Sequence, residues 1–363
     1  MTKFFGLIFL MSWPVGSMAQ TNIMRYADSL LGAGISFLPI PILYNSPETS
    51  WGAGLSTGYY FRQGKGKERN SNVQAQMVYT LRKQFISRLS ADVFGPEENW
   101  YAYGYLSYRS YADRFYGIGP EAQLAERLDF SFRSWEAWGG WLWKLGDFHF
   151  LGPQIRHQYV YRLQPNDPFA WNMQALIGGN GYQTTGLGLE YRYDSRNNVQ
   201  SAQKGWFTQL FGRLHPHWHG SAAFGTVGVD VRHYASIMAN NVWANRLLLQ
   251  QQSGDPPFRE LSMAGGSDFA RGYFEGRYRD KSLAGLESEW RWHAHRYLGI
   301  NAFASVFGVA GTLQQIPQTQ LKGSYGLGLR VFVNPEERIA LRIDVARNTE
   351  GQYGFYIDLS EAF

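Results

Sequence analysis

An arginine in a glycine-rich segment and two glutamates further along the chain are the residues best suited to specific chemistry. Arg271 is followed by Gly272 and Tyr273, and Glu287 and Glu289 occupy alternate positions of a later segment. Side chains two residues apart share a face of a β-strand, so both carboxylates are expected on one side. We expect Arg271 to form a bidentate, charge-assisted pair with Glu289, or with Glu287 one pleat away, while Gly272 allows close backbone approach.

This pair would hold a loop in place and would not catalyse a reaction. The alternative is that Arg271 lies in an exposed loop and is solvated, which is the usual environment of an arginine in a short motif. The two glutamates on one face favour the ion pair. We call the expected arrangement the latch.

Other candidate sites in the sequence are weaker. His215, His217 and His219 alternate beside a proline and could bind a transition metal, but they have no acidic neighbours and resemble a polar loop tip. A hydrolase would need a nucleophile beside a base, and Ser288 is expected on the face opposite His293 and its neighbours. We therefore expect no metal site, no cofactor and no enzymatic activity.

The elements that position these residues have the two-residue period of β-strands. From residue 35 onward, runs of about 10 to 14 residues alternate between an apolar and a polar face, separated by turn residues. Leu187 and Leu189, for example, alternate with Gly188 and Glu190. After the first twenty residues no stretch of roughly 18 apolar residues occurs, which excludes membrane-spanning helices. The chain is predicted to be all-β, either a soluble sandwich or a membrane barrel.

Three features favour a transmembrane barrel. Glycines recur at alternate positions of the polar rows, and tyrosines and tryptophans gather near strand ends. The chain ends on Phe363, which is predicted to lie on an alternating last strand, in register with its apolar row. Sixteen antiparallel strands fit the sequence, with long and short links in alternation. The longest link, residues 255–280, is predicted to be an external loop between strands eleven and twelve that inserts into the barrel. Phe363 is predicted to act as an outer-membrane sorting signal.

The N-terminal residues have the pattern of an export signal. Residues 1–19 contain one lysine, a short apolar run and small residues before Gln20, which predicts a signal peptide. A short segment, residues 20–34, then precedes the barrel at residues 35–363. The net charge of +5 is spread along the chain and forms no block of Lys and Arg, so nucleic acid is not expected as a partner. The chain has no cysteine. The expected location is the cell outer membrane.

Several segments resemble motifs of the BamA/TamA-type outer-membrane assembly superfamily. Residues 264–273 are similar to the family's RGF/RGY loop, residues 115–119 to its FYGIG segment, residues 186–197 to its YDTRDN strand and turn, and residues 286–292 to the strand with its acidic partner. The positions that correspond to family motifs outside the latch are Phe115, Tyr116, Gly117, Gly119, Asp194, Arg196, Phe307 and Gly311. The family's carboxylate on the strand after the acidic one is replaced by Val309.

The resemblance implies a barrel that assists insertion or translocation of proteins or lipids at the outer membrane. Family members carry periplasmic POTRA domains before the barrel, and residues 20–34 are too few for one, so the chain resembles a barrel-only member. The implied partners are outer-membrane lipid, client outer-membrane proteins and a periplasmic accessory subunit. The alternative is a passive, porin-like channel for small solutes.

Overall fold

The computed structural model describes residues 40–61, 63, 69, 71–166, 175–199, 201–218, 223–238, 240–335, 338–359 and 361–363. The predicted signal peptide, the segment 20–34 and His219 lie outside the described residues.

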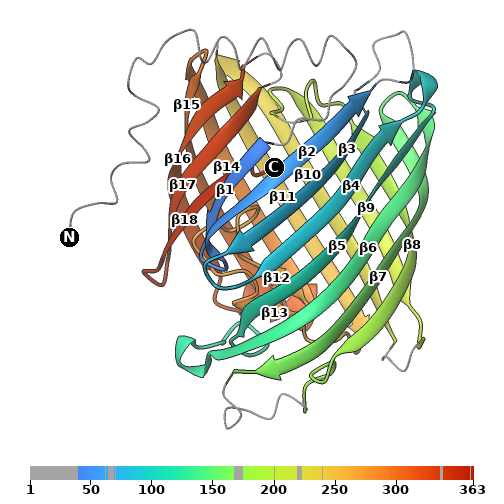
Figure 1. Cartoon of the computed structure of the whole chain (residues 1–363), viewed down its shortest axis with the longest axis vertical. Coiled ribbons are helices and arrows are strands. Elements are labelled where there is room, and N and C mark those ends of the chain that lie inside the picture. The colour runs from blue at the N-terminus through green and yellow to red at the C-terminus, as the bar shows by residue number, and fades with distance from the viewer. Residues whose placement is uncertain are drawn as a thin grey trace.

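Sixteen antiparallel strands form one closed barrel, which confirms the predicted all-β architecture and strand number (Figure 1). The strands of the wall are β1 (Ile40–Ser46), β2 (Ser50–Phe61), β3 (Ser71–Thr80), β4 (Phe85–Phe94), β5 (Trp100–Phe115), β6 (Leu128–Gly146), β7 (His149–Pro165), β8 (Tyr182–Asp194), β9 (Gly205–His215), β10 (Phe224–Met238), β11 (Asn241–Gly254), β14 (Ser282–His295), β15 (Leu298–Ala310), β16 (Lys322–Asn334), β17 (Ile339–Asn348) and β18 (Tyr353–Leu359). No helix in the described part of the chain is long and apolar enough to cross a membrane.

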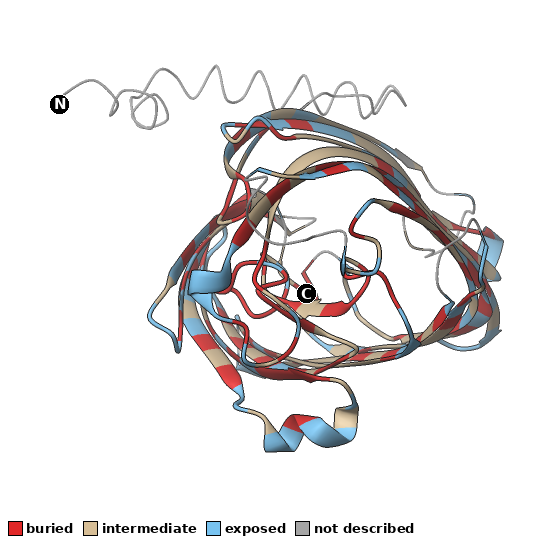
Figure 2. Cartoon of the chain, turned by 90° about the horizontal axis from the view of Figure 1, so that it is seen from below, coloured by how far each residue is buried: buried red, intermediate tan, exposed pale blue. Residues whose placement is uncertain are grey.

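Side chains alternate between the outer wall and the interior, as the sequence period requires. On β8, Leu189 is 63% exposed and the next residue, Glu190, is fully buried. Figure 2 shows buried and exposed residues alternating along the strands. Because the apolar member of each pair lies outside, the wall is built to contact lipid and the polar row lines the interior.

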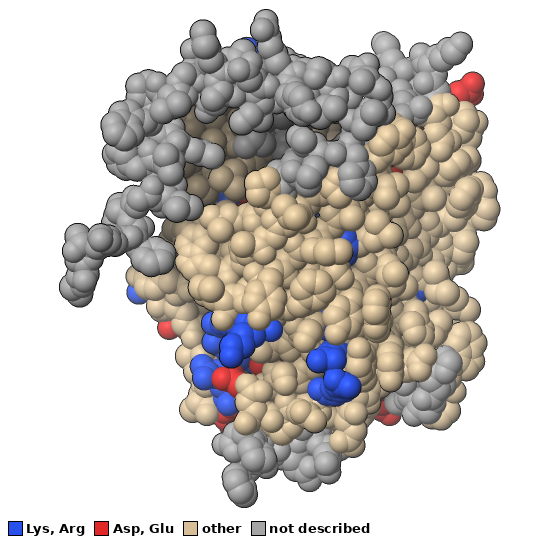
Figure 3. Space-filling view, in the orientation of Figure 1, with Lys and Arg blue, Asp and Glu red and all other residues tan. Residues whose placement is uncertain are grey.

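The outer wall has an apolar band with aromatic side chains at both edges. Trp143, near the end of β6, and Tyr353, at the start of β18, are exposed on the outer wall at opposite ends of the barrel. Figure 3 shows a broad band of the wall almost without charge, with Lys and Arg grouped below it on the face shown. This is the pattern of a surface that crosses a bilayer between two interfacial girdles.

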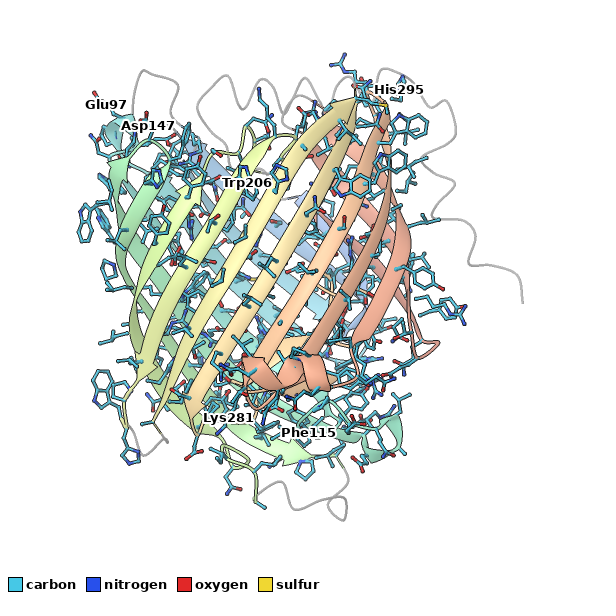
Figure 4. All side chains as sticks on the ribbon, turned by 180° about the vertical axis from the view of Figure 1, so that it is seen from behind. Glu97, Phe115, Asp147, Trp206, Lys281 and His295 are labelled. Atoms are coloured by element: carbon cyan, nitrogen blue, oxygen red, sulfur yellow. The ribbon has the colours of Figure 1, made fainter. Side chains whose placement is uncertain are left out.

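The links at the two ends of the barrel differ in length. Figure 4 places Glu97, Asp147 and His295 near one end, with the short turns, and Phe115 and Lys281 near the other. The remaining elements lie in these links: η2 (Pro96–Glu98), η3 (Leu124–Glu126), the hairpin of β12 (Ser262–Ala264) and β13 (Tyr278–Asp280), and η5 (Leu313–Gln318). The connection between β11 and β14, residues 255–281, thus contains a small hairpin of its own.

The seam between the first and last strands has very little pairing. Within the described residues β1 and β18 share a single facing pair, Asn45 and Ile357. On its other side β1 is paired with β2 along its full length, from Ile40 to Ser46. The barrel is closed, but its weakest joint is where the two ends of the sheet meet.

The C-terminal residue does not lie on the last strand as predicted. β18 ends at Leu359, and Phe363 is 8% exposed, packed in a cluster with Tyr234 and Val242 on the interior face. Arg291 donates a hydrogen bond of 2.9 Å from Nη2 to the Phe363 carbonyl oxygen. The predicted placement of Phe363 on the last strand is therefore wrong, because an apolar patch and a guanidinium inside the barrel bind the chain end; its role in sorting stays a prediction.

Candidate functional site

Arg271 is fully buried among three carboxylates. Its Nη2 atom donates to Oε1 of Glu287 at 2.8 Å and to Oε2 of Glu289 at 2.6 Å, and its Nη1 atom donates to Oδ2 of Asp344 at 2.5 Å. The guanidinium also lies 3.5 Å from the centroid of the Phe303 ring. The structure thus brings together the arginine and both glutamates of the latch, with a cation–π contact on the same group.

Strand geometry explains why these groups meet. Glu287 and Glu289 lie on the interior face of β14, where they face Ser305 and Phe303 of β15. Asp344 lies on the interior face of β17, which is three strands from β14 in the sheet. An arginine from the β11–β14 connection reaches both strands because its planar fork carries several donors.

Asp344 was not expected at this site. With Val309 in place of the family's carboxylate, the charge of Arg271 is expected to be compensated mainly by Glu287 or Glu289. Both glutamates pair with it, and Asp344 is a third partner. The signal was present in the sequence, because Asp344 alternates with apolar residues and therefore belongs to a polar row. What the sequence could not give is how far across the sheet that row lies from β14.

The three carboxylates differ in their other partners. Glu289 also accepts from Arg291 at 3.1 Å and lies 3.4 Å from Arg330, and Asp344 accepts from Arg330 at 2.6 Å. Glu287 pairs only with Arg271 among the described residues, and its Oε2 atom has no hydrogen-bond partner. Arg271 is therefore the only ion-pair partner of Glu287 in the part of the chain that the structure describes.

The residues after Arg271 fix the backbone to the barrel wall. The amide of Gly272 donates to the Tyr356 hydroxyl at 2.8 Å, and the Gly272 carbonyl accepts from Asn348 at 3.0 Å. Gly272 has a φ of +107° and lies so close to β17 that a Cβ atom would be 3.3 Å from the Arg347 backbone. Glycine is thus required for both conformation and approach. Tyr273 is fully buried, and its hydroxyl lies 2.9 Å from that of Thr349.

The FYGIG-like segment packs against the same connection. Phe115 contacts the ring of Phe258 with centroids 5.2 Å apart, and Tyr116 contacts Phe274 at 6.0 Å. The Gly119 amide donates to the Arg279 carbonyl at 2.9 Å. Both glycines of the segment, at 117 and 119, have positive φ angles. The motif thus supports the connection that carries Arg271.

Two other motif positions lie beside the connection. Phe307 packs against Tyr273, with ring centroids 5.2 Å apart, and Gly311 follows directly after β15. Asp194 and Arg196 are not brought to this site. They form an ion pair of 2.8 Å at the end of β8, where Asp194 also pairs with Arg69 at 2.9 Å.

His215, His217 and Ser288, which the structure describes, do not form a converging site. His215 is buried and stacked on Phe224 with centroids 4.0 Å apart, whereas His217 is exposed. Ser288 donates to the Asn245 side chain at 2.8 Å. Over the ranges that the structure describes, no group of three His, Cys, Asp or Glu residues could hold a metal ion.

A buried glutamate joins the first hairpin to the β11–β14 connection. Glu48, in the turn between β1 and β2, is 4% exposed and accepts from the Glu275 amide at 2.8 Å through Oε1. Burial raises the pKa of the Glu48 carboxyl, and hydrogen bonds from Ser46 and the Glu275 backbone offset only part of that effect. The folded state thus favours the neutral form of this group.

This raised pKa predicts a pH-dependent stability. A carboxyl whose pKa is higher in the folded state than its unfolded value of about 4.5 loses folding free energy as the pH rises above that value. We expect wild type to become less stable relative to Glu48→Gln as the pH rises from about 5 to about 8. Urea unfolding, followed by heat-modifiable gel migration, measures the difference. A difference that stays constant with pH would contradict the prediction.

The fold of the chain is similar to that of solved outer-membrane barrels. The chain is similar to the BamA barrel from Haemophilus ducreyi lacking POTRA domains 1–3, with a TM-score of 0.59 and 11% identity over 94% of this chain and 78% of that one. The barrel has the BamA fold. It is also similar to CdiB from Acinetobacter baumannii, with a TM-score of 0.55 and 13% identity over 90% of this chain. CdiB from Escherichia coli matches with a TM-score of 0.57 and 10% identity over 89% of this chain.

The similarity lies in the fold, at low sequence identity. The chain spans 60% and 63% of the two CdiB chains that it matches. No family model matches the sequence, and no curated protein matches it. The structural neighbours thus share the fold of this chain.

Proposed function

We propose that the protein is an outer-membrane barrel of the BamA/TamA type that assists insertion or translocation of proteins, and not an enzyme. The seam between β1 and β18 is the observation that carries this proposal, because one facing pair holds it together. The apolar outer wall and the BamA and CdiB folds support a location in the outer membrane.

A weakly paired seam can accept a strand from another protein. An edge strand presents unpaired N–H and C=O groups, and a client strand that pairs with them satisfies its own backbone groups. In a bilayer this matters more than in water, because an unsatisfied backbone group in lipid costs several kcal/mol. The client we infer is therefore an unfolded outer-membrane barrel protein.

We also propose that the β11–β14 connection is an external loop inserted into the barrel and held there by Arg271. Its contacts with β14, β17 and the β1–β2 turn support this role, since they join three parts of the wall. The same contacts disfavour the passive channel, because an inserted loop would partly fill the interior. Large, steady conductance of the purified barrel in planar bilayers would favour the channel instead.

A reversible disulfide across the seam tests the proposal. The chain has no cysteine, so Asn45→Cys with Ile357→Cys introduces one defined pair. We expect oxidation of this variant to slow the insertion of a urea-unfolded eight-stranded barrel into vesicles that contain it, and reduction to restore the rate.

The matched control places the disulfide where the ladder is already complete. Leu43→Cys with Ala53→Cys joins β1 to β2 at a facing pair, and its oxidation should leave the insertion rate unchanged. Equal rates for the oxidised and reduced seam variant would overturn the proposal.

A further inference from the structure

Two arginines lie on the outer wall where β6 and β7 approach the end of the barrel that carries the long links. Arg133 of β6 is half-buried and faces Tyr161 of β7, and Arg162 is the next residue after Tyr161 and is exposed. Arg133 lies on the same face of β6 as Trp135, which is 44% exposed on the outer wall. We call Arg133 and Arg162 the arginine pair.

A β-bulge places Arg162 on this face. The register of β6 with β7 shifts between Ser131 and Arg133, and Arg162 has a φ of +51°. Without the extra residue, strict alternation after Tyr161 would place the Arg162 side chain in the barrel interior and the Leu163 side chain on the outer wall. Instead Leu163 is 9% exposed and packs in the interior cluster with Phe130. A bulge commonly re-aims a side chain in this way, at the cost of a left-handed conformation that non-glycine residues rarely adopt.

The arginine pair has no acidic partner among the described residues. No ion pair joins either guanidinium to a carboxylate, and the acidic residue further along the outer row of β6, Asp129, pairs with Arg127 at 3.0 Å and with Arg114 at 3.8 Å. Most interior arginines of the barrel, by contrast, pair with carboxylates, as Arg271 does. The pair is thus two cations on a membrane-facing surface that no carboxylate of the described residues compensates.

Aromatic side chains fix the depth of the pair in the bilayer. Tyr108 and Trp135 have ring centroids 4.8 Å apart, and Tyr159 and Tyr161 are stacked at 5.0 Å. Trp135 and Tyr159 are also exposed on the outer wall. Tyrosine and tryptophan gather at the headgroup level of membrane proteins, so the arginine pair lies at that level or just beyond it. Figure 3 shows cations grouped below the uncharged band at this end.

We propose that the arginine pair is a binding site for the phosphate of an anionic lipid headgroup. A guanidinium donates two parallel hydrogen bonds to phosphate oxygens, and two guanidiniums beside each other match a phosphate monoester with its double charge. The aliphatic stems lie along the apolar wall while the charged ends reach the headgroups. The aromatic rings next to the pair would contact the upper part of the acyl chains.

This inference rests on the proposed membrane location but not on a role in insertion. The test therefore uses purified protein and lipid alone. Wild-type barrel is placed in phosphatidylcholine vesicles with trace spin-labelled phosphatidic acid or spin-labelled phosphatidylcholine, and the motionally restricted fraction of each label gives the relative association constant. We expect wild type to prefer phosphatidic acid, and Arg133→Gln with Arg162→Gln to lower that preference by about fivefold for each arginine.

A matched variant separates this site from net charge. Lys204→Gln with Arg296→Gln removes the same charge from exposed positions at the opposite end and should keep the wild-type preference. Arg133→Lys with Arg162→Lys keeps the charge but lacks the planar guanidinium, so this variant should retain part of the preference for phosphatidic acid. Heat-modifiable migration checks that each variant is folded.

Several results would overturn the assignment. They are the absence of a preference in wild type, an unchanged preference in the double glutamine variant, an equal loss in the matched variant, or removal of the preference by inorganic phosphate, which would identify a soluble anion as the ligand. The oxidised seam variant should keep the lipid preference. A failure of the proposed role in insertion can therefore be told apart from a failure of the lipid site.

Discussion

Replacing Arg271 with alanine is expected to free the β11–β14 connection and to lower the free energy of unfolding by about 3–5 kcal/mol, the usual cost of removing one partner from a buried ion pair. The physical cause is the carboxylate that is left behind. Glu289 and Asp344 keep Arg291 or Arg330 as partners, but Glu287 keeps none. Proteolysis within residues 255–281 and the urea unfolding midpoint measure the two effects.

A second substitution identifies that carboxylate as the cause. Glu287→Gln added to Arg271→Ala removes the uncompensated charge and should recover part of the lost stability. Alone, Glu287→Gln should have a smaller effect than Glu289→Gln, because Glu289 is an acceptor for three arginines. If the effects of Arg271→Ala and Glu287→Gln simply add, the pair is not coupled and the latch is not the reason for burial.

Placing a charge on the outer wall should be nearly as damaging. Leu189→Arg, at a 63% exposed position in the middle of β8, is expected to lower stability in a bilayer by about 2–4 kcal/mol, because the guanidinium would lie among acyl chains. The control is Ser90→Arg on β4, a half-buried residue that lines an interior cavity and faces Gln74 and Tyr105, where water solvates the new charge. Unfolding from vesicles compares the two variants, and equal tolerance would contradict a lipid-facing wall.

Gly188, the interior neighbour of Leu189, would be a poor control. A Cβ atom there would lie 2.1 Å from the Gly212 carbonyl oxygen, so any side chain displaces the backbone of β9. The sequence showed that this position belongs to the polar row but not how close the next strand lies.

The barrel could be predicted because each strand repeats the same local rule. Alternation such as that of Leu189 and Glu190 can be recognised within a single strand. The number of strands then follows from counting such segments, and successive strands run in opposite directions. The hairpin of β12 and β13 was missed because strands of three residues carry too little alternation to be recognised. The turn of the chain end into the interior was missed for a different reason, since the patch around Tyr234 that binds Phe363 belongs to distant strands.

The site was predictable to the extent that its residues share one strand. Glu287 and Glu289 lie on the same face of β14 by period alone, and a glycine beside Arg271 indicated a close approach. Asp344 and Phe303 come from other strands, and their distance from Arg271 depends on the register and curvature of the closed sheet. No local pattern in one sequence specifies those quantities.

The single facing pair at the seam also bears on how the barrel folds. Every other joint in the wall links strands that are consecutive along the chain or, for β11 and β14, separated by the 255–281 connection, so each closes a much shorter loop than the seam does. Asn45 and Ile357 can meet only after the whole sheet has curled, and the loop that they close is nearly the length of the described chain. Closure should therefore be the last step of folding and the first step of unfolding, with most of the barrel intact on either side of it.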